Sequence, residues 1–334
     1  MPRATRGNAW DMAENHPLQT LTHDLAEQSA RRRTQFRLAP DETAAGGLRR
    51  IVRGQIEVAT GGFERGDDLG EAVHEARKSF KRMRAAVRLS RDLLGDEVYR
   101  AENRAYRDAG RELSDARDAQ VLRETLDDLA HRYRKEIDAD AFAGLRQALD
   151  ADATAAHEQL ERNSAAIDEI RANLDSARDR VDTWPQPEGT DASVLAPGFE
   201  RIYKRGRRAR RAAEHEAGDE TMHELRKRAK DLWHAAQILR PAKPKRMKRL
   251  GRRAHRLSDL LGDDHDLAVL LEAVGTRPRT LRPGEVALLR RLIAHRRKRL
   301  QREALACARR IYRRKPSAWR DRIARPVTRV VNDP

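Results

Sequence analysis

Apolar residues recur along this 334-residue chain with the period of an α-helix. Val73, Phe80 and Val87 lie seven residues apart, which is two helical turns, and Leu225 and Leu232 repeat that spacing later in the chain. We therefore expect an all-α fold. The pattern predicts helices near 41–65, 71–94, 97–113, 116–135, 139–181, 198–217, 220–239, 244–261, 264–274 and 283–314.

Two motifs occur twice in the same order. Val73–Lys81 reads VHEARKSFK, and 149 residues later Met222–Lys230 reads MHELRKRAK. Leu113–Leu122 reads LSDARDAQVL, and 148 residues later Leu261–Leu270 reads LGDDHDLAVL. Repetition at nearly one offset indicates a duplicated unit. The fold we predict is two pseudo-symmetric four-helix-type bundles that arose by internal duplication.

Proline and glycine mark the boundary between the two copies. Pro185, Pro187 and Gly189 break any helix in this segment, which we interpret as a linker. The predicted organisation is an N-terminal extension over 1–40, a first helical half over 41–183, the linker over 184–197, a second helical half over 198–325 and a C-terminal tail over 326–334.

Each copy of the first motif carries a row of basic residues on one helix face. The spacing i, i+3, i+4, i+7 places His74, Arg77, Lys78 and Lys81 in one stripe, and His223, Arg226, Lys227 and Lys230 in another. Cationic donors about one turn apart suit a linear polymer of phosphates, in which every unit offers charge and acceptor oxygens. The alternative is a solvated face paired with helical carboxylates. The repetition of the same basic stripe in both copies favours the binding interpretation.

Further basic positions extend these stripes. Arg88 continues the first stripe, and Arg50 and Arg53 form a shorter one on the preceding helix. The matching helix of the second copy repeats the four-residue spacing with Lys204, Arg207, Arg208 and Arg211. Two adjacent basic faces in each half are expected to form a groove.

The leading histidines have three interpretations, namely a phosphate donor, a metal ligand or a packed side chain. Metal binding is the least favoured, because neither stripe offers a second histidine or a carboxylate at i+4. A histidine with a near-neutral pKa gains charge beside phosphate. As donors, His74 and His223 should therefore bind more strongly as pH falls through their titration range.

The second motif supplies paired aspartates, Asp115 with Asp118 and Asp263 with Asp266. We favour a helix N-cap with an acidic residue in the first turn, and Gly262 ending the helix before it. The alternative is that Asp118 and Asp266 orient the basic side chains of the stripes. The two interpretations are compatible.

Charge is distributed unevenly along the chain. The formal net charge is +17, and residues 201–334 hold 39 Lys and Arg against 15 Asp and Glu, a net of +24. Residues 1–200 therefore carry −7. Such a field attracts polyanions. The single cysteine, Cys307, excludes an internal disulfide and a zinc site built from several cysteines. Without a long apolar run or a signal-peptide core, we expect a cytoplasmic protein with no membrane partner.

Together these motifs resemble the CHAD family, the conserved histidine α-helical domain, over roughly residues 36–325. The similarity lies in His-x-x-Arg-Lys-x-x-Lys in each half and the downstream Leu-x-Asp-x-x-Asp-x-x-Val-Leu. It implies paired four-helix bundles whose basic residues line a central groove or pore that binds inorganic polyphosphate, with no established catalysis, cofactor or metal. The positions it selects are both stripes, Arg50, Arg53, Arg201 and Lys204, with Arg84, Arg88, Arg104 and Arg252 as additions.

The last predicted helix adds a basic face that its first-half counterpart lacks. This face consists of Arg291, His295, Lys298 and Arg302, whereas the 139–181 segment is acidic. His295, Arg302 and Arg208 complete the predicted binding set, and the polymer is expected to lie toward the second half. Association with polyphosphate granules is a further expectation.

Two other function classes compete with polyphosphate binding. A nucleic-acid-binding protein is suggested by the basic second half, but no reading motif or interleaved aromatics accompany the stripes. A phosphate-transferring or hydrolysing enzyme would need a phosphate-binding glycine loop or paired carboxylates for a metal, which the stripes lack. We therefore expect a binding protein that is not an enzyme.

Overall fold

The structure is a computed structural model that describes residue 32 and residues 34–65, 68–111, 115–187 and 191–325. This part of the chain contains helices and connecting segments but no strand, so the predicted all-α class is confirmed. The first half holds α2 (Ala44–Arg65), α3 (Leu69–Leu89), α4 (Arg91–Leu94), α5 (Asp96–Arg111), α6 (Asp115–Arg132), α7 (Ala143–Arg162) and α8 (Ser164–Asp182). The second holds η1 (Ala192–Leu195), α9 (Ala196–His215), α10 (Asp219–Ile238), α11 (Pro244–Thr276), η2 (Pro278–Thr280), α12 (Glu285–Ile311) and α13 (Ser317–Ala324).

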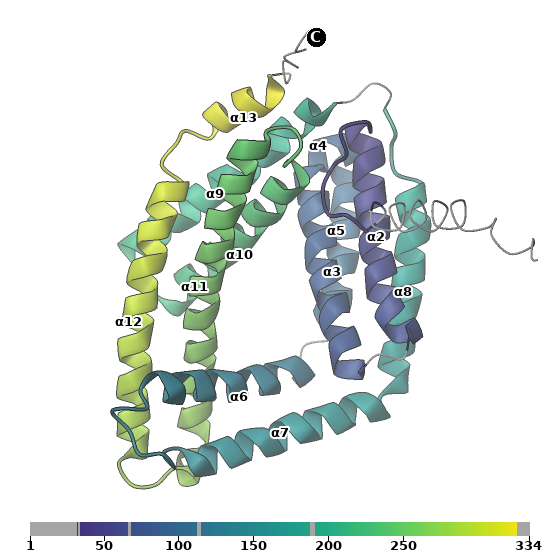
Figure 1. The fold of residues 1–334 in the computed structure, drawn as a ribbon. Coiled ribbons are helices and arrows are strands. Elements are labelled where there is room, and N and C mark those ends of the chain that lie inside the picture. Colours follow the sequence, from purple (N-terminus) through teal and green to yellow (C-terminus); the bar gives the residue numbers. More distant parts are fainter. Residues whose placement is uncertain (1–31, 33, 66–67, 112–114, 188–190, 326–334) are drawn as a thin grey trace, which may run out of the picture.

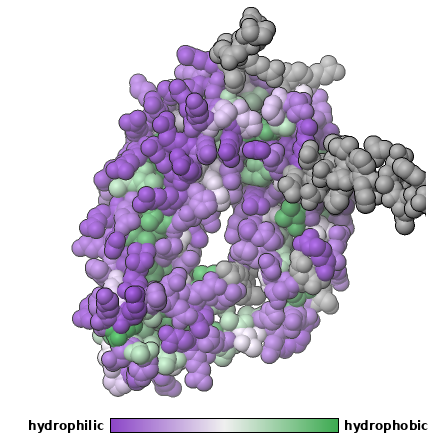
Figure 2. All heavy atoms as spheres, in the orientation of Figure 1, coloured by the Kyte–Doolittle hydropathy of each residue, from purple (hydrophilic) through white to green (hydrophobic). Residues whose placement is uncertain are grey.

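The helices enclose an opening. α2, α3, α5 and α8 form one bundle, and α9 to α12 form the other, with α3 in contact with α9 and α10 (Figure 1). α6 and α7 cross below from one bundle to the other and contact both α3 and the second bundle. Figure 2 shows the opening through the middle of the molecule between these parts. None of the described helices is long and apolar enough to cross a bilayer.

Two hydrophobic cores hold the ring together, and neither follows the halves of the sequence. The larger core runs through both bundles and joins Phe80 and Met83 of α3 to Phe199 and Leu225 of the second half. The smaller core packs α6 and α7 against the C-terminal part of α11 and the N-terminal part of α12, with Phe142 fully buried. Burial of apolar surface therefore stabilises the contacts between the halves as well as each half.

Three predicted helix boundaries are wrong. The predicted helix 71–94 is divided at Ser90 between α3 and α4. The segment 139–181 is not one helix, because it is divided at Asn163 between α7 and α8. Gly262 does not end a helix and Asp263 does not cap one, since α11 continues through both. A mid-helix glycine costs about 1 kcal/mol relative to alanine. Leu261 and Leu267, buried on either side of Gly262, outweigh that cost by packing.

The contact between α9 and the end of α3 requires a glycine. A Cβ atom at Gly198 would overlap the backbone carbonyl oxygen of Leu89. We expect Gly198→Ala to lower the free energy of unfolding by about 1–3 kcal/mol through overpacking. Urea unfolding measures this. Gly275→Ala is the control, because nothing lies within 4 Å of a Cβ there, and equal stability of the two variants would contradict the close-packing account.

Candidate functional site

A pocket of about 540 Å³ lies where α3, α5 and α10 meet, and we call it the central pocket. It joins the basic stripes of the two halves. Its lysines and arginines are Arg77, Lys81, Arg84 and Arg88 of α3, Arg107 and Arg111 of α5, and Arg226, Lys227, Arg228 and Lys230 of α10. Glu224 and Asp231 are the carboxylates of the lining. The excess of positive charge suits a multivalent anion.

The cations of the central pocket repel one another. Burial, followed by the charges of Arg226 and Lys81, lowers the pKa of Lys230 to about 8. Burial and then Arg88 lower the pKa of Arg84 to about 10, and the charge of Asp231 opposes this. A folded protein that holds half-buried like charges together is under strain that a bound anion would relieve.

His223 and Arg226 present polar atoms without partners. Within the described part of the chain, the buried His223 Nδ1 and Arg226 Nε have no hydrogen-bond partner. The imidazole of His223 packs against that of His265 in a tilted arrangement with ring centroids 4.6 Å apart, and the Arg226 guanidinium lies against Gly262 of α11. Buried polar atoms are normally satisfied, so unpaired ones indicate a place for a ligand or water.

The pKa of His223 departs from the near-neutral value expected from the sequence. Burial, then Lys227 and His265, lower it to about 4. His223 is therefore neutral at pH 7 without ligand, with one ring N–H to donate. The correction follows first from burial and then from the neighbouring cations, and single-helix spacing reveals neither.

Asp231 ties the two stripes together at one end of the central pocket. Asp231 is 6% exposed, and its carboxylate accepts from Arg88 Nη1 of α3 at 2.7 Å and from Arg228 Nη1 at 2.8 Å. The pair with Arg88 joins the halves of the chain directly. A buried carboxylate between two guanidinium groups holds both in place.

The first stripe contributes only some of its predicted residues. Arg77 and Lys81 line the central pocket with the additions Arg84 and Arg88, whereas His74 and Lys78 do not. Lys78 forms an ion pair with Glu75 on its own helix. The whole second stripe, by contrast, lines the central pocket: His223, Arg226, Lys227 and Lys230.

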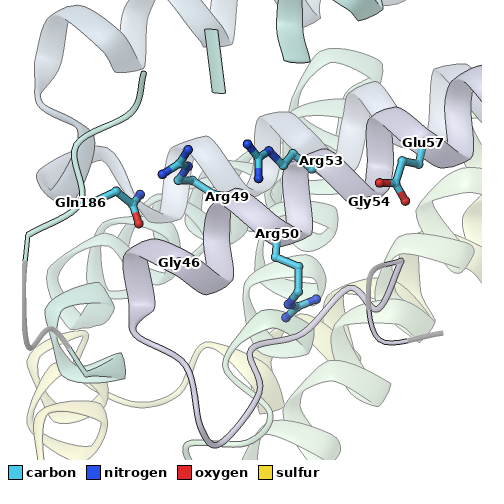
Figure 3. A pocket seen from close by; sticks show the side chains of 7 residues that line it. All are labelled: Gly46, Arg49, Arg50, Arg53, Gly54, Glu57 and Gln186. Atoms are coloured by element: carbon cyan, nitrogen blue, oxygen red, sulfur yellow. The ribbon is translucent and has the colours of Figure 1, made fainter. Parts of the chain in front are cut away.

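Arg50 and Arg53 do not join the first stripe in a groove. They line a separate pocket of about 310 Å³ on α2, where Figure 3 shows Arg50 pointing away from Arg53 and Arg49. Arg53 pairs with Asp182, and Arg50 pairs with Glu42 at 2.6 Å. Arg50 also donates to the backbone carbonyls of residues 32, 35 and 37, so it anchors the segment before α2.

The remaining predicted residues also lie outside the central pocket. Arg201 pairs with Asp92 at 2.7 Å, and His295 Nδ1 lies 2.8 Å from the hydroxyl of Tyr133. The others are exposed and line none of the pockets described here; they are Arg104, Lys204, Arg208, Arg252 and Arg302. The second basic face that we expected against each stripe therefore does not line the central pocket, which has no lining residue from α2 or α9.

Sequence reasoning missed the contribution of α5. Arg107 and Arg111 line the central pocket, while Arg104, which the family resemblance selected, does not. The spacing of Arg104, Arg107 and Arg111 is i, i+3, i+7, which is the stripe pattern already used for α3. Arg228 and His265 were also missed, and no spacing signal identifies them.

The second-half aspartates lie between α6, α11 and α12. Asp263 and Asp266 line a pocket of about 570 Å³, and Asp263 pairs with Arg296 at 3.5 Å. The charge of Asp266 raises the pKa of Lys230 and so counteracts part of its lowering, which fits the alternative role of a residue that supports the stripe. The side chains of Asp115 and Asp118 lie outside the described residues.

Comparisons with known proteins agree on the fold and the family. A family model described as the CHAD domain matches residues 50–275. The fold is similar to PptA from Streptomyces chartreusis, at 15% identity and a TM-score of 0.57, covering 82% of this chain and 100% of that one. It is also similar to the CHAD domain from the plant Ricinus communis, at 17% identity and a TM-score of 0.53, covering 87% and 95%. Curated proteins give no significant match. Since the family model matches more than half of the sequence, the chain belongs to the CHAD family.

Proposed function

We propose that this protein binds inorganic polyphosphate in the central pocket. The observation that carries the proposal is the meeting of both basic stripes around one cavity, where cations lower one another's pKa. Membership of the CHAD family adds support, since some members bind polyphosphate. A polyphosphate supplies one negative charge or more per phosphate, which matches donors spaced by helical turns on α3 and α10.

Most of the binding free energy would come from charge. Each phosphate that meets a lysine or arginine releases counterions, so affinity falls steeply as salt rises. Hydrogen bonds between guanidinium or ammonium groups and phosphate oxygens add to this, and they are strongest where water is partly excluded. Arg84, Arg226 and Lys230, all half-buried, are the residues that we expect to contribute most.

Nucleic-acid binding is the second candidate, favoured by the net charge of the second half. Unpaired bases are usually held by stacking on exposed aromatic rings. The lining contains no tryptophan, and its one phenylalanine and one tyrosine, Phe80 and Tyr106, are each 1% exposed, so neither offers a face for stacking. The pocket chemistry therefore favours a polyanion without bases.

A competition experiment distinguishes the candidates. Labelled polyphosphate is bound to the protein at moderate salt, and unlabelled polyphosphate or duplex DNA is added at equal phosphate concentration. We expect polyphosphate to displace the label and DNA to leave most of it bound. Displacement by DNA at the same concentration would support the nucleic-acid candidate instead.

Binding should weaken above pH 8. The groups that act on Lys230 are Arg226 on its own helix, Lys81 of α3, and Asp266 and Asp259 of α11. Bound phosphate raises the pKa of Lys230. Once the pH exceeds the pKa of Lys230 in the ligand-free protein, which is about 8, binding therefore takes up a proton. Affinity should fall by up to about tenfold for each unit by which the pKa rises.

Lys230→Arg provides the matched test of this pH dependence. Arginine stays charged, so the variant should bind like the wild type at pH 7 and lose less affinity between pH 7 and 9.5. Calorimetric titration at several pH values across this range measures the affinity at pH 7 and its fall toward pH 9.5. The same fall in the two proteins would show that Lys230 is not the titrating group.

We also propose a binding role without catalysis, in the cytoplasm and on polyphosphate granules. The stripes supply cations but no paired carboxylates that would hold a catalytic metal ion. Incubation with polyphosphate and a divalent metal should release no phosphate above background. Measurable release that depends on the protein would contradict the assignment.

A further inference from the structure

A second group of arginines surrounds a small pocket on the outside of the second bundle. The pocket, about 140 Å³ in volume, lies where the first turns of α11, the end of α12 and α13 meet. α13 follows the upper end of α12 in Figure 1. We call its basic lining the outer arginine cluster. Its members from α11, from the last turn of α12 and from the segment that follows α12 are Arg246, Arg249, Arg253, Arg310, Arg313 and Arg314.

The outer arginine cluster has a large excess of positive charge. No carboxylate lines the pocket, and within the described residues none of these arginines forms an ion pair. Arginines elsewhere on the surface, such as Arg201 and Arg309, do pair with nearby carboxylates. Arg322 of α13 adds a further guanidinium, and its pKa is lowered by burial and then by Arg314 and Arg246. The charge of Asp321 opposes only part of this lowering.

An apolar floor holds the outer arginine cluster in place. Trp319 lines the pocket, is 8% exposed and packs against Phe199 and Tyr203. The Arg322 guanidinium lies 5.9 Å from the Trp319 ring centroid, in the range of a cation–π contact. The spacing of Arg246, Arg249 and Arg253 is i, i+3, i+7, so α11 directs them to one side.

The C-terminus of α12 explains only part of this arrangement. Basic residues near the end of a helix interact favourably with its dipole, which accounts for Arg310 in the last turn. It does not account for the arginines of α11, because they lie in the first turns of their helix, where the dipole disfavours cations. Their position beside the arginines at and after the end of α12 adds to the repulsion, and an anion bound between them would lower it.

We propose that the outer arginine cluster is a second anion site, which binds a phosphate group such as the end of a phosphate chain. Its volume equals that of about five water molecules in the liquid, enough for one tetrahedral phosphate. Guanidinium groups from two helices bind phosphate oxygens bidentately. The site shares no lining residue with the central pocket. One molecule can therefore hold phosphate at two separate places.

Calorimetric titration with pyrophosphate tests this site independently of the central pocket. In a variant whose central pocket is disabled (Lys81→Gln, Arg226→Gln, Lys230→Gln), we expect one pyrophosphate to bind still. Adding Arg249→Gln, Arg253→Gln and Arg313→Gln should lower that affinity at least tenfold. The matched control adds Arg279→Gln, Arg290→Gln and Arg291→Gln, which are exposed, line none of the described pockets and remove the same charge.

The outcomes separate the two proposals. Loss of all pyrophosphate binding on disabling the central pocket would overturn the outer site and leave the proposed function intact. Equal affinity after the outer and the control substitutions would also overturn it, as would binding of duplex DNA without binding of pyrophosphate. A further variant carries only the outer substitutions at Arg249, Arg253 and Arg313. If neither this variant nor the wild type binds polyphosphate in the central pocket, the proposed function fails, whether or not the outer site binds phosphate.

Discussion

Replacing Lys81, Arg84, Arg226 and Lys230 together by glutamine is expected to lower the affinity for a short polyphosphate at least about 100-fold at moderate salt. All four residues line the central pocket, from both halves of the chain. Each charge-assisted hydrogen bond contributes on the order of 1 kcal/mol or more. The salt dependence of binding should become shallower, because fewer counterions are released. Fluorescence anisotropy with an end-labelled polymer measures both quantities.

The matched control removes the same charge from the surface. Lys204, Arg208, Arg252 and Arg302 are exposed and line none of the described pockets. Their replacement by glutamine should change the affinity within about threefold, because exposed charges are screened at moderate salt. An equal loss in both quadruple variants would mean that net charge, and not the central pocket, determines binding.

Asp231→Asn is expected to lower the free energy of unfolding by about 3 kcal/mol while polyphosphate binding becomes tighter. The carboxylate of Asp231 bridges Arg88 and Arg228, so its loss leaves two half-buried guanidinium groups without this charge partner. A bound polyphosphate would replace the missing negative charge. Polyphosphate should therefore raise the melting temperature of the variant more than that of the wild type.

Asp92→Asn is the control for the stability effect. Asp92 pairs with Arg201, but both side chains are more than a third exposed, so the loss of stability should be below about 1 kcal/mol. Thermal unfolding of both variants, with and without polyphosphate, completes the comparison. A variant at Asp231 that is destabilised yet gains no more from polyphosphate than the wild type would contradict the proposed balance of charges.

Hydrophobic periodicity was sufficient to predict the helical class and the positions of most helices. It failed where tertiary packing outweighs local signals. Gly262 resembles a helix end, yet the buried leucines around it keep α11 continuous. No proline or glycine beside Asn163 indicates the helix break there. These boundaries depend on how α6, α7 and α11 pack, which a single helix does not encode.

The site was predictable only in part, for a geometric reason. Helical spacing shows which residues share a face, and it correctly grouped Arg226, Lys227 and Lys230. It does not show which helix that face meets. Arg50 and Arg53 fit the stripe pattern but lie against Glu42 and Asp182 on the outside of α2. The contact between α3 and α10 is a feature of the tertiary structure, and helical spacing does not predict it.

The central claim is that both basic stripes hold one polyphosphate in the central pocket. A crystal structure with a short polyphosphate, at a resolution that places phosphorus atoms, tests this most directly. We predict a chain of phosphate density between α3 and α10, with oxygens within hydrogen-bond distance of Lys81, Arg226 and Lys230. Density confined to the exposed surface, with the central pocket holding only water at a saturating concentration of polyphosphate, would contradict the claim.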